Sequence, residues 1–95
     1  MKINVFGKEI EFDENNPGVK YVLEECCECI NETWISVFYD QLVNAKRITK
    51  PKDSLTIKEI KKIIEFGMLD SINYVEEGNH LDLSKEKEYV RLALQ

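Results

Sequence analysis

Two short segments at the start of the chain alternate apolar and polar residues, which predicts an antiparallel β-hairpin. Residues 2–6 and 9–12 are the expected strands, and residues 7–8, Gly-Lys, form a two-residue turn between them. This turn pairs Val5 directly with Ile10. The same register places the apolar side chains of the hairpin on one face: Ile3, Val5, Ile10 and Phe12.

The next segment, residues 17–48, repeats apolar residues at helical spacing and predicts one long amphipathic helix. Asn16 serves as its N-cap and Pro17 as its first residue, where a missing N–H costs nothing. Asparagine is a middling helix former, so a break near Asn31 is an open alternative. The expected core-facing stripe comprises Val19, Leu23, Cys26, Cys27, Ile30, Trp34, Val37, Phe38, Ala45 and Ile48.

The opposite side of this helix is acidic in its first half and apolar in its second half. A solvated face does not ordinarily carry a row of apolar residues, so we expect another element or a partner to cover it. A solvated acidic face, neutralised in part by the basic residues 46–62, is the simpler interpretation. The candidate partner-binding residues are Tyr21, Glu24, Glu25, Glu28, Glu32, Ile35 and Tyr39.

A second helix is predicted from its capping signals. Thr56 and Glu59 stand at the N-cap and N3 positions of a capping box, and Leu55 and Ile60 occupy the two positions of a hydrophobic staple. The helix therefore begins at residue 57. Gly67 is a natural residue to follow its last turn, so we expect the helix to end there.

The rest of the chain favours a three-stranded meander. Residues 71–77 and 80–84 flank a Gly-Asn pair that suits a hairpin turn, and a short loop leads to a third strand that ends near residue 94. The competing interpretation makes residues 85–94 a helix capped by Ser84. The element order is then β-β-α-α-β-β-β, an α+β domain with one long and one shorter helix on one face of an antiparallel sheet.

Length and composition are those of one globular domain covering residues 1–95. No apolar run approaches the roughly 20 residues of a membrane helix, and no signal-peptide segment opens the chain, so we expect a cytoplasmic protein. The three cysteines are odd in number and lie close together in sequence, which favours reduced thiols over a disulfide framework.

The chain has a net charge of −5, and its charged residues are distributed unevenly along the sequence. Residues 1–45 hold three basic and nine acidic side chains, residues 46–62 hold seven basic and two acidic, and residues 63–95 hold three basic and seven acidic. This acidity disfavours direct binding to nucleic acid or to a membrane surface. A local anion site is compatible with the basic linker at Lys46, Arg47, Lys50 and Lys52.

No catalytic or cofactor motif is present in the sequence. On a helix Cys26 and Cys29 share a side, but Cys27 points about 100° away, so the three thiols cannot converge on one metal ion. His80 is the only histidine of the sequence. Buried packing is the simpler role for the cysteines. We therefore expect no cofactor, no metal and no enzymatic activity.

The function that these features favour is that of a small acidic inhibitor or adaptor, which occupies a basic site on a target protein, for example a nucleic-acid-binding channel. In size, acidity and absence of catalytic motifs the chain resembles the broad class of phage anti-defence proteins, which includes anti-CRISPR inhibitors, and the immunity or antitoxin partners of bacterial toxins. This resemblance is one of composition. The alternative is a homo-oligomer that binds a nucleotide-like anion through residues 46–52 and self-associates through Ile35, Tyr39 and Val43.

Overall fold

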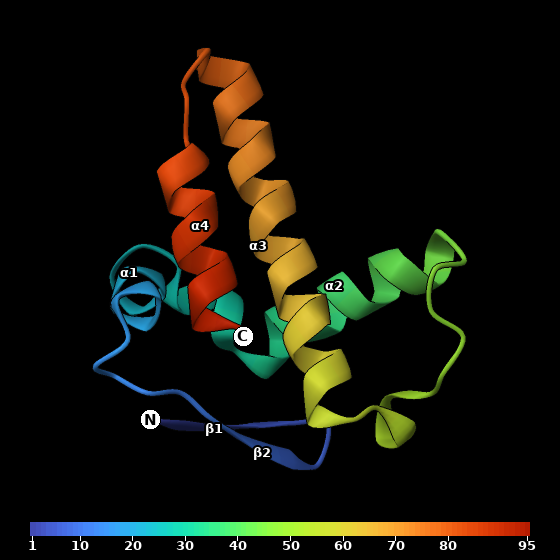
Figure 1. Cartoon of the computed structure of the whole chain (residues 1–95). Helices are drawn as coiled ribbons and strands as arrows, with labels where there is room; N and C mark the ends of the chain where they lie inside the picture. Colours follow the sequence, from blue (N-terminus) through green and yellow to red (C-terminus); the bar gives the residue numbers. More distant parts are fainter.

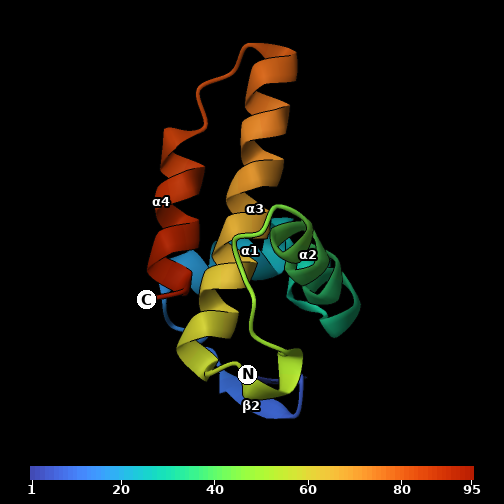
Figure 2. The same ribbon diagram turned by 90° about the vertical axis from the view of Figure 1, so that its right-hand side faces the viewer.

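The computed structural model of the chain consists of a β-hairpin followed by four α-helices and two short 3-10 helices. It describes the backbone of all 95 residues and every side chain except that of Glu28. The long helix α3 lies between α4 on one side and α2 on the other, and the tip of the α3–α4 pair stands away from the rest of the molecule (Figure 1, Figure 2). The elements are β1 (Lys2–Val5), β2 (Lys8–Glu11), α1 (Pro17–Glu25), η1 (Cys27–Ile30), α2 (Glu32–Asn44), η2 (Lys52–Ser54), α3 (Ile57–Asn79) and α4 (Ser84–Ala93).

The predicted hairpin is present, but the predicted register is wrong by two residues. Ile3 pairs with Ile10, and Val5 pairs with Lys8. The turn therefore falls on Phe6 and Gly7, which both have positive φ angles, of 52° and 80°. A two-residue turn of this kind needs positive φ at both central positions, and glycine occupies the second. A shift of two residues keeps the apolar side chains on the same face, and Val5 and Ile10 are fully buried.

Tertiary contacts hold Phe6 in this uncommon backbone conformation. Its ring meets Tyr39 edge to face at a centroid distance of 6.0 Å, and the Lys52 ammonium lies 5.3 Å from the ring centre. Its backbone N–H donates to the Glu32 carboxylate at 3.2 Å. These contacts dock the hairpin turn on α2 and η2, and none of them is visible in the local sequence.

The single helix predicted over residues 17–48 is wrong, because the chain breaks between α1 and α2. Asn16 caps α1 as predicted, since its side chain accepts from the N–H groups of Gly18 and Val19. Asn31 does the same for α2, accepting from Thr33 and Trp34. The open alternative of a break near Asn31 is therefore the arrangement that the structure has.

The break changes which side of the second half is buried. A continuous helix would place Trp34 and Val37 on the core side, yet their side chains are 46% and 39% exposed. Ile35 and Leu42 are buried instead, while Phe38 is buried as predicted. The 3-10 segment η1 and the cap at Asn31 interrupt the 100° increment per residue, so the periodicity of α1 does not extend into α2.

The start of α3 agrees with the prediction, but its end does not. Thr56 accepts from the Glu59 N–H at 3.1 Å, and Glu59 accepts from the Thr56 N–H at 3.0 Å, which completes the capping box. The helix continues past Gly67 to Asn79, and His80 adopts the left-handed conformation of a C-cap. Gly67 is a packing residue: a Cβ at this position would lie 2.3 Å from the Phe38 ring.

The three-stranded meander is wrong, and with it the β-β-α-α-β-β-β order. Residues 71–77 belong to α3, and residues 84–93 form α4. Helix α4 packs against α1, where a Cβ on Gly18 would lie 2.3 Å from the Tyr89 carbonyl oxygen. The competing helical interpretation of residues 85–94 is the correct one, although the helix begins at Ser84 and Leu83 holds the N-cap position.

One core unites these elements, because the hairpin, each α-helix and the segment before α3 contribute buried apolar side chains to it. Its members are Val5, Ile10, Phe12, Val19, Val22, Ile30, Ile35, Phe38, Leu42, Leu55, Ile60, Ile63, Ile64, Met68, Ile72, Val90, Ala93 and Leu94.

We predict that the two glycines of α3 respond to alanine in opposite directions. Gly67→Ala should lower the free energy of unfolding by about 1 to 3 kcal/mol, because the added Cβ overpacks the Phe38 ring. Gly78→Ala should raise it by roughly 0.5 kcal/mol, since nothing lies within 4 Å of the added Cβ and alanine favours the helix. Urea unfolding followed by circular dichroism measures both. A Gly67→Ala protein as stable as the wild type contradicts the contact.

Candidate functional site: a groove between α1 and α3

A hollow of about 520 Å³ lies between the end of α1 with η1 and the middle of α3. We call it the thiol groove. Among the side chains that the structure describes, one carboxylate and no cation line it. The lining residues are Tyr21, Glu25, Cys26, Cys27, Cys29, Met68, Ser71, Ile72, Val75 and Leu83.

The floor of the thiol groove comes from one side of α3. Met68, Ile72 and Val75 follow one another at helical i, i+4 and i+7 spacing, so they lie along the same side of the helix. Met68 and Ile72 are buried, whereas Val75 is 44% exposed. The floor therefore runs from the core outward to solvent, and Val75 is its most accessible apolar side chain.

The opposite wall is formed where α1 ends. The Cys26 N–H donates to the Val22 carbonyl at 2.8 Å, and the Cys29 N–H donates to the Cys26 carbonyl at 2.9 Å, which begins the 3-10 turn. Cys26 and Cys27 carry free thiols. Desolvation raises the pKa of the Cys26 thiol, and the neighbouring Cys29 and Glu25 add to this effect. Cys26 is therefore a neutral thiol at pH 7 and not an activated nucleophile.

Tyr21 forms the rim of the thiol groove beside Glu25. Its ring stacks on Tyr89 of α4 with a centroid distance of 5.4 Å and an interplanar angle of 26°. Desolvation, followed by the charges of Cys26, Glu86 and Glu25, raises the pKa of Tyr21 to about 12. The phenol therefore remains protonated at neutral pH in an electronegative surrounding, where it adds an aromatic surface to the rim.

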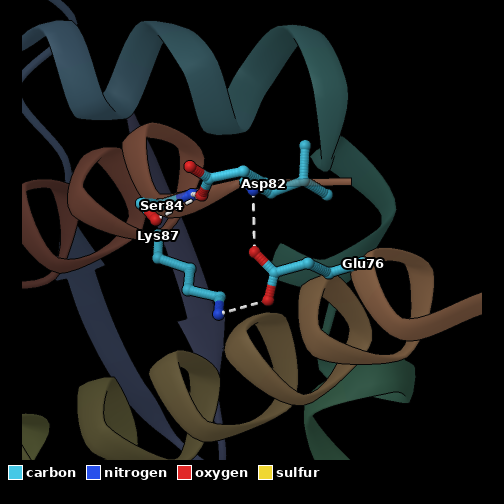
Figure 3. A network of polar contacts seen from close by, with 5 residues as sticks. Glu76, Asp82, Ser84 and Lys87 are labelled. Carbon is cyan, nitrogen blue, oxygen red and sulfur yellow. Dashed lines mark hydrogen bonds and ion pairs between the residues drawn. The ribbon is translucent and has the colours of Figure 1, made fainter. Parts of the chain in front are cut away.

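A polar network at the turn between α3 and α4 fixes Leu83, which lines the thiol groove. Figure 3 shows Glu76, Asp82, Ser84 and Lys87 of this network. The Glu76 carboxylate accepts from the Leu83 N–H at 2.7 Å and from the Lys87 ammonium at 2.7 Å. Asp82 accepts from both the hydroxyl and the N–H of Ser84, and thereby begins α4. Lys87 and then the Leu83 N–H hold the pKa of Glu76 below its ordinary value, so the carboxylate is charged at neutral pH.

The structure separates the candidate partner-binding residues into several places. Tyr21 and Glu25 line the thiol groove, and Glu24 lies exposed on α1 outside its lining. Glu32 and Tyr39 contact Phe6 in the hairpin turn. The remaining two are Ile35, which is fully buried and is corrected to a core residue, and Glu28, whose side chain lies outside the described residues.

The predicted self-association face also loses a member through the burial of Ile35. Tyr39 is half-buried, and its hydroxyl donates to the Lys50 carbonyl at 2.7 Å. Val43 is 38% exposed on the last turn of α2. The three residues therefore do not form the continuous apolar surface that the alternative hypothesis required.

The four basic residues of the linker do not converge on one anion site. Lys50 pairs with Glu59 at 3.1 Å, and the Arg47 guanidinium lies 5.6 Å from the Phe66 ring centre. Arg47 and Lys50 do line one hollow, of about 460 Å³, but Glu59 lines it with them. The other two lie elsewhere: Lys52 against the rings of Phe6 and Tyr39, and Lys46 exposed in the left-handed conformation.

Much of the thiol groove is not anticipated by the sequence pattern, which places Val75 and Leu83 in strands and Cys26 in the core. The signal that could have placed the α3 residues is the helical spacing of Ile60, Ile64, Met68 and Ile72, which continues without interruption through Gly67. No local signal indicates Leu83, because its position depends on the Glu76 carboxylate seven residues earlier.

Among the side chains that the structure describes, no three His, Cys, Asp or Glu residues cluster as a metal site would require. Comparisons with protein-family models, curated proteins and solved structures find no match to this chain. None of the described helices combines the length and apolar character needed to cross a bilayer.

We predict that Tyr21 makes folding sensitive to alkaline pH. The unfolded chain ionises this phenol near 10.0, but the folded protein keeps it protonated up to about 12, so stability should fall as pH rises through that window. Tyr21→Phe should remove this part of the loss, which urea unfolding of both proteins at several pH values measures.

An ultraviolet titration provides an independent readout of the same group. The difference between the wild-type and Tyr21→Phe absorbance should show phenolate formation near 12. A difference titration centred near 10 would mean that the groove rim does not perturb Tyr21.

Proposed function

We propose that the protein is a small acidic inhibitor or adaptor, whose thiol groove receives an apolar side chain from a basic segment of a target protein. The observation that carries the proposal is the lining of the groove, which is mainly apolar, contains the Glu25 carboxylate and has no cation. An apolar hollow beside an uncompensated negative charge is complementary to an apolar residue next to lysine or arginine.

The charge around the thiol groove supports a basic partner. Glu24 and Glu25 lie on α1, and Glu86 on α4 is close enough to Tyr21 to raise its pKa. The net charge of the chain is −5. Such a field attracts a cationic partner and speeds the encounter, and salt weakens it.

The apolar part of the thiol groove supplies the affinity. Val75 is 44% exposed, and Tyr21 presents a stacked aromatic ring at the rim. Burying the rest of a valine side chain contributes roughly 1 kcal/mol, and an aromatic anchor contributes more. The Cys26 thiol and the Tyr21 phenol are both neutral at pH 7, so they add contact surface without a desolvation penalty for charge.

The target class follows from the same chemistry. A basic segment with interspersed apolar residues is typical of proteins that bind nucleic acid, and occupying it would block that function. This role corresponds to that of phage anti-defence proteins and of immunity or antitoxin proteins, which the chain resembles in size and acidity.

The test begins with a random peptide library, because such a probe can be used before the target is identified. Panning the library on the immobilised protein should enrich peptides that combine lysine or arginine with apolar residues. The dissociation constant of one enriched peptide should rise about tenfold for Val75→Asp and severalfold for Glu25→Lys, since each variant removes one half of the complementarity. Fluorescence polarisation measures these constants.

Two substitutions elsewhere are matched controls. Val43→Asp changes a valine of similar exposure on α2, and Glu24→Lys changes a neighbouring carboxylate outside the groove lining. Both should leave the dissociation constant within about twofold of the wild-type value. The proposal fails if neutral or acidic peptides are enriched, or if Val43→Asp weakens binding as much as Val75→Asp does.

The same variants then identify the natural target. A nuclease-treated lysate should yield one protein that the wild type and Val43→Asp capture and that Val75→Asp loses. Sedimentation of the purified protein tests whether a second copy of the chain occupies the thiol groove instead. A dimer that Val75→Asp dissociates and Val43→Asp does not would assign the groove to self-association and refute a basic target.

A further inference from the structure

A second hollow, of about 700 Å³, lies between the first turns of α3 and the end of α4. We call it the lysine hollow. It shares no lining residue with the thiol groove. Its lining consists of Ile57, Lys58, Lys61, Lys62, Glu65, Arg91, Leu94 and Gln95.

The three lysines of this hollow form no ion pair with any described side chain, unlike Lys50 and Lys87. Lys50 and Lys87 each form an ion pair, with Glu59 and Glu76. In contrast, no ion pair to any described side chain involves one of the three lysines of the hollow, Lys58, Lys61 and Lys62. Arg91 from α4 joins them and bonds to the exposed Glu88 at 2.8 Å. Of the acidic side chains that the structure describes, Glu65 alone contributes to the lining.

The arrangement leaves electrostatic repulsion unrelieved. Lys58 lies three and four residues before Lys61 and Lys62, so all three project over neighbouring turns of one helix, where each like-charge pair costs about a few tenths of a kcal/mol. The chain is rich in acidic residues, yet Glu65 is the one described acidic side chain in the lining of this hollow. A bound anion would relieve this repulsion, and the first turn of a helix already favours negative charge.

We infer that the lysine hollow binds a small polyvalent anion of the phosphate class, such as the polyphosphate part of a nucleotide. Three ammonium groups supply point charges to separate oxygens, and the Arg91 guanidinium can exchange the exposed Glu88 for two phosphate oxygens. No aromatic side chain lines the hollow to stack a base, so the charged group and not a single strand is the ligand.

This site replaces the one expected on the basic linker. In the hollow lined by Arg47, Lys50 and Lys62, Lys50 pairs with Glu59 and Arg47 stacks on Phe66, so two of the three cations already have partners. The lysines without an ion pair, Lys58, Lys61 and Lys62, lie in the first two turns of α3. Lys62 lies at the border of the two hollows and lines both. The lysine hollow and the thiol groove share no lining residue, so anion binding can be tested independently of the proposed target binding.

Titration of the labelled protein with inorganic triphosphate, at constant ionic strength set with sodium chloride, tests the inference. Amide resonances of residues 58–62 and 91 should shift in a saturable manner, with half-saturation below about 1 mM at low salt. Wild-type shift mapping needs no variant, so a folding defect cannot obscure it.

Two matched triple variants locate the site. The first variant changes Lys58, Lys61 and Lys62 together to Gln. It should raise the dissociation constant for triphosphate at least about tenfold. The control variant changes Lys8, Lys20 and Lys46 together to Gln, which removes the same charge outside the hollow. It should raise the dissociation constant for triphosphate less than about threefold.

Three results would overturn the inference. The first is a shift pattern that does not saturate or that chloride alone reproduces. The second is an equal loss of binding in the two triple variants. The third is tighter binding of oligothymidylate than of triphosphate at the same residues, which would assign the hollow to nucleic acid.

Discussion

The close contact between Phe38 and Gly67 is the constraint on which the rest of the fold depends. Because residue 67 has no side chain, the Phe38 ring of α2 lies directly against the backbone of α3. Helix α2 can therefore cross the middle of α3 without bending α3, which is unbroken over its 23 residues. This continuity carries Met68, Ile72 and Val75 beyond the crossing, where they form the floor of the thiol groove.

Length in α3 also separates two surfaces of opposite character. Its first turns present three unpaired lysines beside α4, whereas its second half presents apolar side chains beside the acidic end of α1. The Glu76 carboxylate stabilises the turn that leads from α3 into α4, because it accepts hydrogen bonds from both the Leu83 N–H and the Lys87 ammonium. A charged group at the turn thus shapes an apolar groove, and α4 is placed so that Tyr89 stacks on Tyr21.

Polar groups in the thiol groove are held in their neutral forms, which is relevant to what it can bind. Cys26 and Tyr21 are neutral at pH 7, and desolvation extends this neutral range to higher pH, so Glu25 is the acidic residue of the described lining. Recognition then combines apolar contact with one sign of charge, and salt should weaken only the second component. The lysine hollow has the reverse balance, since charge dominates there and contact is secondary.

Local hydrogen bonding determined where the helices of this protein begin. Tertiary packing determined which side of α2 is buried and where α3 ends. The sequence by itself placed Asn16, the Thr56–Glu59 capping box and the N-terminal hairpin, because each depends on hydrogen bonds or alternation within a few residues. It also brought Tyr21 and Glu25 forward as candidate contacts. It could not show that Gly67 packs under a ring, that Phe6 takes a positive φ, or that Ile35 turns inward after Asn31. These outcomes depend on contacts between segments far apart in the chain, and a glycine that ends a helix looks the same in sequence as one that admits a neighbouring ring.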